Sequence, residues 1–225
     1  MEARSIDAGE AIRHGWDATK ANFNSLVVLV IVAGLLTGIP SWIAETLKEP
    51  SPGLSFLFRL MGFVMSMLLG IGALRVSLRL HDGQPVSLQD LFIADWPLFW
   101  RYILATLLYS LAVGVGLILF VIPGVVLGVR YVLYGYFVLE RGARPVEALR
   151  QSATATEGVR WEIFLLMLLL LVLNVLGAAL LLVGLLFTIP LTYLTGAWVY
   201  RRLTGGTVVQ PGHASPDTLD RSHAV

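Results

Sequence analysis

The sequence predicts an all-α integral membrane protein, a bundle of six transmembrane helices in three hairpins, each preceded by a short cytoplasmic interfacial helix. Residues 163–200 carry no charged side chain, and further uncharged runs lie at 21–44, 60–74 and 102–129. Hydrophobic residues make up 56% of the chain and charged residues only 14%. Because a helix needs roughly 20 apolar residues to cross a bilayer, the longest run fits two crossings joined by a tight turn.

Six crossings follow from these runs when each run is divided at its turn signals. They are expected at Phe23–Leu47, Phe58–Leu78, Phe99–Ile122, Pro123–Glu140, Trp161–Val183 and Leu185–Arg202. Three prolines follow isoleucines near the far ends of the hairpins. Proline lacks a backbone N–H and clashes with the preceding turn, so we expect Pro123 to start a helix and Pro40 and Pro190 to kink one.

The basic residues predict the orientation. Only Lys48 and Arg59 fall on one side of the expected crossings, whereas the other arginines and lysines outside the crossings fall on the opposite side. Cytoplasmic loops carry the excess of basic residues in bacterial membrane proteins, so both termini are expected in the cytoplasm. Residues 1–203 then form one membrane domain in the cell inner membrane. Residues 204–225, rich in glycine, proline and serine, are expected to be a disordered cytoplasmic tail.

Three polar segments precede the hairpins and are expected to form short interfacial helices. In residues 6–23, the large apolar residues Ile12, Trp16 and Phe23 lie near one helical face. The second segment begins at Ser87, where Asp90 completes a capping-box pattern, and it continues with the stripe Leu88, Leu91, Phe92 and Trp96. The third covers 145–158, with Pro145 at its start and Gly158 at its end.

Small residues at helical spacing indicate where the crossings pack together. Lipid offers no hydrophobic force between helices, so close backbone approach has to hold them. The second crossing carries one continuous face of small residues, and the first and fourth crossings carry glycine pairs: Gly62, Ser66, Gly70, Ala73 and Ser77, then Gly34 and Gly38, then Gly124 and Gly128. A compact monomer follows from these seams, and the same pattern leaves open a homo-oligomer or a membrane partner protein.

Arg130 is the one charged residue expected deep in the membrane, roughly 10 Å from the outer turn at the helical rise. An arginine there costs roughly 2.5–3.5 kcal/mol on insertion scales. One interpretation is that Arg130 binds an anion or a lipid phosphate, assisted by Tyr134 and Asn174. The other is that it snorkels outward or caps carbonyls freed near Pro123, and that Asn174 only joins two helices.

Recognisable catalytic chemistry is absent from the sequence. There are no cysteines, the four histidines are scattered, and no H-E-x-x-H or G-x-S-x-G motif occurs. We therefore expect no metal, no cofactor and no enzymatic activity, and the net charge of +1 argues against nucleic acid. Three acidic residues at the inner boundary are expected to form ion pairs with nearby arginines: Glu140 with Arg141, Glu162 with Arg160, and Asp95 with Arg101.

Three motifs resemble an uncharacterised family of bacterial polytopic membrane proteins. They are residues 83–87 (Gly-Gln-Pro-Val-Ser), residues 121–124 (Val-Ile-Pro-Gly) with Arg130, and residues 145–152 (Pro-Val-Glu-Ala-Leu-Arg-Gln-Ser). That family is similar to the membrane domain attached to some glycerophosphodiester phosphodiesterases. The resemblance covers roughly residues 5–203 and implies a polytopic membrane fold. Because the soluble phosphodiesterase domain is missing, it implies no such activity here.

Two functions follow from these observations. The first is a non-enzymatic bundle that handles or senses membrane lipids or small anions, with Arg130 as the contact. The alternative is a scaffold or partner subunit that recruits proteins through its cytoplasmic interfacial helices.

Overall fold

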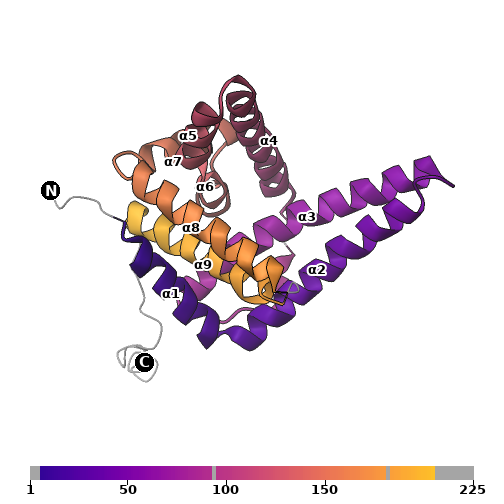
Figure 1. The fold of residues 1–225 in the computed structure, drawn as a ribbon, viewed down its shortest axis with the longest axis horizontal. Coiled ribbons are helices and arrows are strands. Elements are labelled where there is room, and N and C mark those ends of the chain that lie inside the picture. Colours follow the sequence, from indigo (N-terminus) through magenta and orange to yellow (C-terminus); the bar gives the residue numbers. More distant parts are fainter. Residues whose placement is uncertain (1–5, 93–94, 181–182, 206–225) are drawn as a thin grey trace, which may run out of the picture.

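The computed structural model describes residues 6–92, 95–180 and 183–205, and every regular element in these ranges is a helix (Figure 1). In chain order the elements are α1 (Ala8–Ala21), α2 (Phe23–Thr46), α3 (Pro52–His81), the single 3-10 turn η1 (Leu88–Leu91), α4 (Trp96–Leu119), α5 (Val121–Tyr131), α6 (Tyr134–Arg141), α7 (Pro145–Ala155), α8 (Arg160–Ala179) and α9 (Leu185–Thr204). Beyond Gly205, the expected tail lies outside the described residues.

Five helical segments are long and apolar enough to cross a membrane. They are Phe23–Thr46, Pro52–His81, Trp96–Leu119, Val121–Arg141 and Arg160–Ala179. These five segments agree with an integral membrane protein. The sixth expected crossing corresponds to α9, which does not belong to this set.

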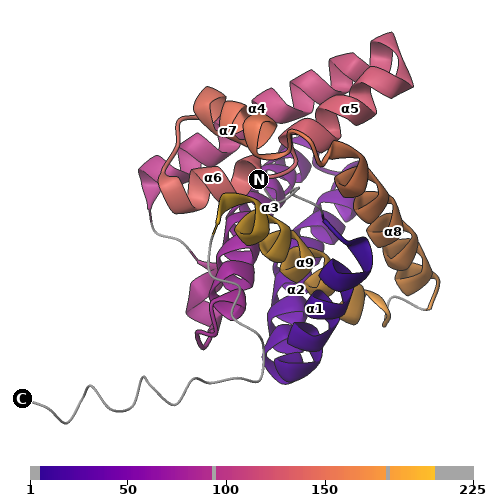
Figure 2. The ribbon, with the colours of Figure 1, turned by 90° about the vertical axis from the view of Figure 1, so that its left-hand side faces the viewer.

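The central position of α9 explains its more polar composition. This helix packs against α1, α2, α3 and α8, and Figure 2 shows it surrounded by these neighbours. Its large aromatic residues Trp198 and Tyr200 are fully buried. A helix covered by protein on several sides can carry threonine and tyrosine where a lipid-facing helix carries leucine and valine, so hydropathy alone does not single it out.

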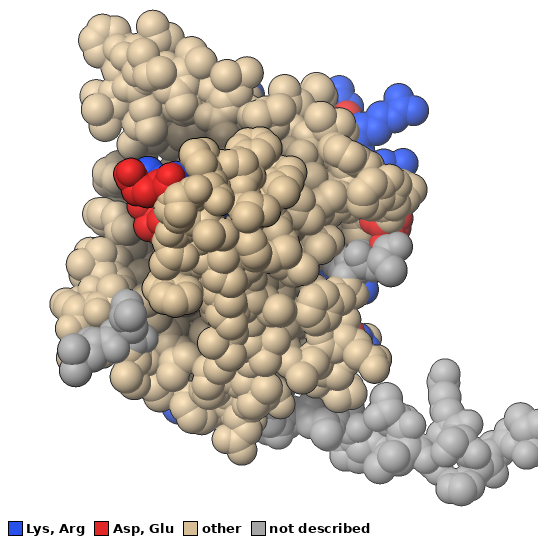
Figure 3. All heavy atoms as spheres, turned by 90° about the vertical axis from the view of Figure 1, so that its right-hand side faces the viewer, with Lys and Arg blue, Asp and Glu red and all other residues tan. Residues whose placement is uncertain are grey.

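Two helix pairs extend away from this centre. Helices α2 and α3 run side by side, as do α4 and α5, and the two pairs point in different directions in Figure 1. The turn between α4 and α5 is strongly exposed and apolar, with Ile118 86%, Phe120 75% and Ile122 77% accessible. The face in Figure 3 is mostly free of charged side chains. Such a large apolar surface fits lipid rather than water.

The fourth expected crossing is two helices instead of one. Helix α5 ends at Tyr131 and α6 begins at Tyr134, and the pair Val132–Leu133 forms the bend between them. At such a break, backbone N–H and C=O groups lose their hydrogen bonds within the helix and need other hydrogen-bond partners. The helix therefore depends on a neighbouring element at this point.

Helix α1 packs against α9 through small residues rather than through its large apolar ones. Ala11, Gly15 and Ala18 are buried, whereas Trp16 is 41% exposed. A Cβ atom on Gly15 would lie 2.4 Å from the Thr195 hydroxyl of α9, so only glycine permits this close crossing. In the sequence, the shared face of Ile12, Trp16 and Phe23 did not indicate this packing, because a pattern of large apolar residues does not report close backbone approach.

The second polar segment forms a single 3-10 turn. The predicted capping pair is confirmed, since the Ser87 backbone N–H donates to the Asp90 carboxylate at 2.8 Å. The chain after Leu91 is extended at Phe92, residues 93–94 lie outside the described residues, and Trp96 of the predicted stripe begins α4. Gly72 of α3 holds η1 in place, because a Cβ atom there would lie 2.3 Å from the Leu91 carbonyl oxygen.

Candidate anion-binding site

The bend after Arg130 is completed by hydroxyl groups of α7. The Arg130 carbonyl accepts hydrogen bonds from Ser152 Oγ at 3.2 Å and Thr156 Oγ1 at 3.1 Å. The Leu133 N–H in turn donates to Ser152 Oγ at 3.1 Å. Ala148, Ser152 and Thr156 follow one another at intervals of four residues and are all fully buried. The small face of α7 thus replaces the backbone bonds lost between α5 and α6.

This packing places Arg130 in a basic pocket of about 320 Å³ at the junction of α5, α7 and α8. Three arginines and one glutamate line it, together with Tyr131 and mainly small or apolar residues of α7: Arg130, Arg150, Arg160 and Glu157, with Val146, Leu149, Ala153 and Thr154. The distance of Arg130 from the outer turn in the sequence predicts that this residue lies among apolar transmembrane helices. In the structure it lies beside the charged helix α7 and the first turn of α8.

The two arginines from the helical crossings are incompletely paired. Nε of Arg130 and Nε of Arg160 are buried and have no hydrogen-bond partner among the described residues. The Arg130 guanidinium lies 5.6 Å from the centre of the Tyr131 ring, and Arg160 Nη2 donates to the Ala153 carbonyl at 3.3 Å. Neither forms a salt bridge within the described residues.

The third arginine of the pocket has a carboxylate partner outside it. Arg150 pairs with Glu147 at 2.9 Å on the exposed side of α7. Hydrogen bonds from Gln151 and Arg150 lower the pKa of Glu147 below its ordinary value. Because Glu147 stays ionised, the uncompensated positive charge of the pocket comes mainly from Arg130 and Arg160, opposed by Glu157.

The structure does not bring Tyr134 and Asn174 to Arg130. The Tyr134 ring stacks on Tyr109 at 4.9 Å, and its hydroxyl lies 2.9 Å from Thr106 Oγ1 of α4. The Asn174 amide donates to the Leu170 carbonyl at 2.8 Å and to Thr192 Oγ1 of α9 at 2.9 Å. Asn174 therefore joins α8 to α9, as the structural interpretation of that residue predicted.

The predicted small-residue seams divide into tight contacts and open surfaces. A Cβ atom on Gly62 would meet Ser41 of α2 at 3.6 Å, and one on Gly124 would lie 2.5 Å from the Leu117 side chain of α4. Ser77 is buried. A Cβ atom on Gly70 would lie 3.3 Å from the Tyr102 hydroxyl of α4. Ser66, Gly70, Ala73 and Ser77 line an apolar groove of about 330 Å³ with Gly34, and a Cβ atom on Gly34 or Gly38 would meet nothing within 4 Å. Gly128 also borders a cleft, and a Cβ atom there would lie 3.8 Å from Tyr109 Oη.

The three predicted prolines lie in helices. Pro40 and Pro190 lie inside α2 and α9, and Pro123 lies in the first turn of α5.

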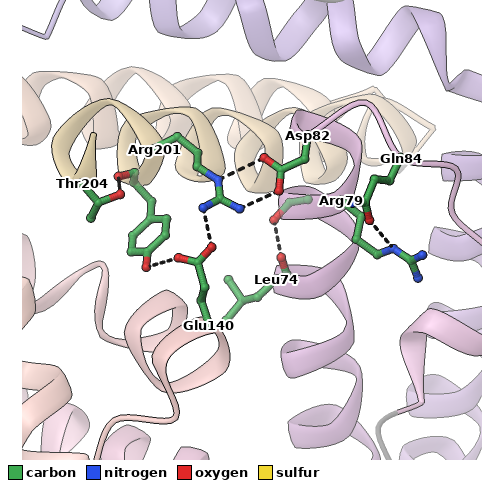
Figure 4. A network of polar contacts seen from close by, with 9 residues as sticks. Leu74, Arg79, Asp82, Gln84, Glu140, Arg201 and Thr204 are labelled. Atoms are coloured by element: carbon green, nitrogen blue, oxygen red, sulfur yellow. Dashed lines mark hydrogen bonds and ion pairs between the residues drawn. The ribbon is translucent and has the colours of Figure 1, made fainter. Parts of the chain in front are cut away.

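The sequence did not predict the polar network shown in Figure 4. Arg201 of α9 binds the Asp82 carboxylate through two nitrogens, at 3.1 and 2.6 Å, and also pairs with Glu140 of α6. Glu140 in turn accepts a hydrogen bond from Tyr200. The network ties together the ends of α3, α6 and α9. The positions of the charged residues in the sequence did not predict this network, because Asp82 follows the end of a helix and is followed by Gly83, a pattern typical of a turn.

The three predicted local ion pairs are wrong, since none forms within the described ranges. Glu140 pairs with Arg201, Asp95 caps α4 by accepting from the Leu98 N–H, and Arg101 donates to the Gly142 carbonyl at 2.7 Å. Glu140 and Glu162 lie only one or two positions from their expected partners, and such side chains on a helix point in different directions. Asp95 and Arg101 lie six positions apart, which is more than one helical turn. Nearness in sequence was therefore a poor guide to pairing at the helix ends.

Two histidines meet between α1 and the end of α3. The rings of His14 and His81 lie 5.2 Å apart, and Nε2 of each is buried with no partner in the described part of the chain. No cluster of three or more His, Cys, Asp or Glu side chains suited to a metal ion occurs among the described residues. Two imidazoles alone do not make a metal centre.

Within the described residues, these features define an all-helical protein with five helical segments apolar enough for a membrane and a basic pocket where α5, α7 and α8 meet. The chain is similar to uncharacterised mycobacterial proteins. It is 26% identical to the uncharacterised protein Rv2560 of Mycobacterium tuberculosis over 244 residues, which cover 96% of this chain and 74% of that protein. Identity to the uncharacterised protein Mb2590 of Mycobacterium bovis is 25%, with the same coverage.

No protein-family model matches the chain, and no solved structure matches it. The names of the mycobacterial relatives state no activity, and none of them connects the chain to glycerophosphodiester phosphodiesterases. The resemblance to the membrane domain of those enzymes therefore stays a prediction.

Proposed function

We propose that this chain is a non-enzymatic protein of the bacterial inner membrane that binds anionic phosphate groups in the pocket of Arg130, Arg150 and Arg160. The observation that carries the proposal is that Arg130 and Arg160 both have a buried Nε without a partner and line the same cavity. A buried donor left without a partner costs about 1–3 kcal/mol. An oxyanion in the pocket would supply acceptors for both.

Phosphate suits this arrangement better than a carboxylate of the protein itself. Guanidinium groups bind phosphate oxygens through two parallel N–H donors, which is why arginine is favoured at phosphate sites. Glu157 is the acidic residue of the pocket lining, and Arg150 already has Glu147 as its partner. The pocket therefore has a charge and donor geometry that a phosphate diester of a lipid would complement.

We also propose that all three helix pairs cross the membrane, with α9 as the sixth crossing and both termini in the cytoplasm. The uncharged run through most of α9 supports this, as does the excess of basic residues on the side of α7. The basic pocket then faces the cytoplasmic leaflet, where anionic lipids give a negative surface potential.

The test compares lipid binding by full-length variants. Delipidated protein in neutral detergent is titrated with phosphatidylglycerol or phosphatidylcholine, and bound lipid is counted by native mass spectrometry. We expect preference for phosphatidylglycerol and a loss of at least about tenfold in its affinity in Arg130→Gln and Arg160→Gln. Arg59→Gln is the matched control, because Arg59 is exposed and pairs with Glu45 far from the pocket. Equal binding by all four proteins would refute the proposal.

A further inference from the structure

A second cavity, of about 630 Å³, lies between the α4–α5 pair and helices α8 and α9. Its lining is almost entirely apolar. Asn174 contributes the amide in it, and both N–H donors of that amide are already used by the Leu170 carbonyl and by Thr192. The Thr195 hydroxyl also lines the cleft and is buried without a partner among the described residues, but the remaining lining offers a ligand almost no polar surface. Its volume lies within the roughly 300–1,000 Å³ typical of sites for small molecules.

One face of α8 joins this cleft to the basic pocket. Arg160, Phe164, Met167, Leu171 and Asn174 follow one another at intervals of four and three residues, and such residues share one side of a helix. Arg160 lines the pocket, and the other four line the cleft. Helix α5 also borders both cavities, since Arg130 lines the pocket and Val129, on an adjacent side of the helix, lines the cleft. The two cavities thus adjoin each other along the same two helices, one basic and one apolar.

The cleft opens toward the outer surface of the helices. Val125, Leu168 and Leu171 line it and are 37%, 46% and 59% exposed. Gly128 of α5 leaves space inside the cleft because it has no side chain. A Cβ atom at this position would have the Tyr109 hydroxyl as its nearest neighbour, at 3.8 Å. A hydrocarbon chain can enter such a cleft sideways from the bilayer without passing through water. An apolar cavity without an occupant lacks the dispersion contacts that its lining would otherwise make.

We infer that one anionic glycerophospholipid occupies both cavities, with its phosphate between Arg130 and Arg160 and an acyl chain along α8 in the cleft. This inference rests on the proposed function and extends it, because it names the ligand as a whole lipid instead of a free phosphate or a detached headgroup. A soluble anion would satisfy the arginines but leave the cleft unfilled. A neutral lipid would fill the cleft but leave the guanidinium groups unpaired.

The test separates the headgroup from the chains. Full-length protein in neutral detergent is titrated with dioleoyl phosphatidylglycerol and, in a second arm, with glycerol 3-phosphate, again read by native mass spectrometry. Gly128→Leu places a side chain into the cleft, and Val125→Trp blocks it from its exposed rim. Gly38→Leu is the matched control, because a Cβ atom there meets nothing within 4 Å and Gly38 lies on α2, outside the cleft. Thermal unfolding confirms that each variant is folded.

We expect wild type and Gly38→Leu to bind phosphatidylglycerol at least about tenfold more tightly than glycerol 3-phosphate. In Gly128→Leu and Val125→Trp, phosphatidylglycerol binding should fall to the level of glycerol 3-phosphate, whose own binding stays unchanged. If both cleft variants bind the lipid like wild type while Arg130→Gln does not, the acyl-chain site is refuted and the anion site stands. If Arg130→Gln also binds both ligands like wild type, the proposed function fails as well.

Discussion

Arg201 and Asp82 form a two-point ion pair between the last turn of α9 and the residue that follows α3, with nitrogen–oxygen distances of 2.6 and 3.1 Å (Figure 4). The Arg201 side chain is 15% exposed and also serves Glu140 of α6. One guanidinium therefore neutralises two carboxylates from different helices. Removing it leaves both carboxylates facing each other in a partly buried site.

The first prediction follows from this shared role. Arg201→Ala should lower the free energy of unfolding by roughly 1–3 kcal/mol, less than for a fully buried pair because the carboxylates are partly exposed. Arg201→Lys should recover only part of the loss, since an ammonium group cannot make the two-point contact. Unfolding in mixed micelles of neutral detergent and sodium dodecyl sulfate measures both. Arg59→Ala, which breaks an exposed pair, should change stability by less than about 1 kcal/mol; a similar effect in both alanine variants would contradict the prediction.

The second prediction concerns pH and His14. Burial of the ring lowers the pKa of His14 below its ordinary value of 6.5, and nearby Asp17 and Glu10 offset this only in part. The His81 ring of α3 lies beside it, with the ring centres 5.2 Å apart. The unfolded chain therefore binds a proton at His14 more readily than the folded protein. Stability from this group is complete above pH 6.5 and is lost as pH falls from 6.5 toward the folded-state pKa.

Melting temperatures in detergent at pH 7.5 and pH 5 check the sign of this effect. The drop between the two pH values should be smaller in His14→Gln than in wild type, because the glutamine cannot titrate. Carboxyl groups elsewhere contribute equally to both proteins and cancel in the comparison. An identical drop in the two proteins would mean that His14 has no part in the pH dependence.

The third prediction tests the bond between Asn174 and Thr192. Intramembrane hydrogen bonds contribute on average about 0.6 kcal/mol and at most about 1.7 kcal/mol. Asn174→Leu and Thr192→Val should each destabilise the protein by about that amount. Because each variant removes the same contact, the double variant should lose less than the sum of the two. Strict additivity in the unfolding free energies would show that the two side chains do not interact.

The fourth prediction separates a tight glycine from a free one. Gly72→Ala should destabilise the protein by about 1–3 kcal/mol, because its Cβ would collide with the backbone of Leu91, which cannot rotate away. Gly34→Ala has nothing within 4 Å and should be neutral or stabilising by up to about 1 kcal/mol through helix propensity. Unfolding free energies of both variants decide this; a stable Gly72→Ala protein would show that η1 is not fixed on α3.

The long apolar helices were predictable because hydropathy over some 20 residues is a local property of the chain. The expected crossing at Phe23–Leu47 lies within one residue of α2, and the start expected at Trp161 lies one residue from that of α8. The close contact at Gly72 was not predicted, because Gly72 belongs to no helical repeat of small residues. Its contact partner is Leu91 of η1, which follows α3 in the chain. The sequence separation between Arg201 and Asp82 likewise carries no signal of their pairing.

Arg130 was identified from the sequence as the residue to follow, but its surroundings were not. A continuous helix from Pro123 to Glu140 would place it in hydrocarbon beside Tyr134 and Asn174. The break at Val132–Leu133 changes this, and that break is stabilised by hydroxyl groups from α7. A tertiary contact thus decides the environment of the arginine, and no pattern within residues 123–140 reports it.

The fifth prediction tests this dependence of the pocket on α7. Ser152→Ala removes a buried hydroxyl that accepts from the Leu133 N–H and donates to the Arg130 carbonyl. The variant leaves the Leu133 N–H without its acceptor, whereas the Arg130 carbonyl keeps its hydrogen bond from Thr156 Oγ1. We expect a loss of about 1–3 kcal/mol in unfolding free energy. Thr154→Ala, an exposed hydroxyl on the same helix, should change stability by less than about 0.5 kcal/mol. Because Ser152 does not line the pocket, weaker phosphatidylglycerol binding in a folded Ser152→Ala protein would mean that the bend positions Arg130. Unchanged stability would instead show that α5 and α6 hold their angle without α7.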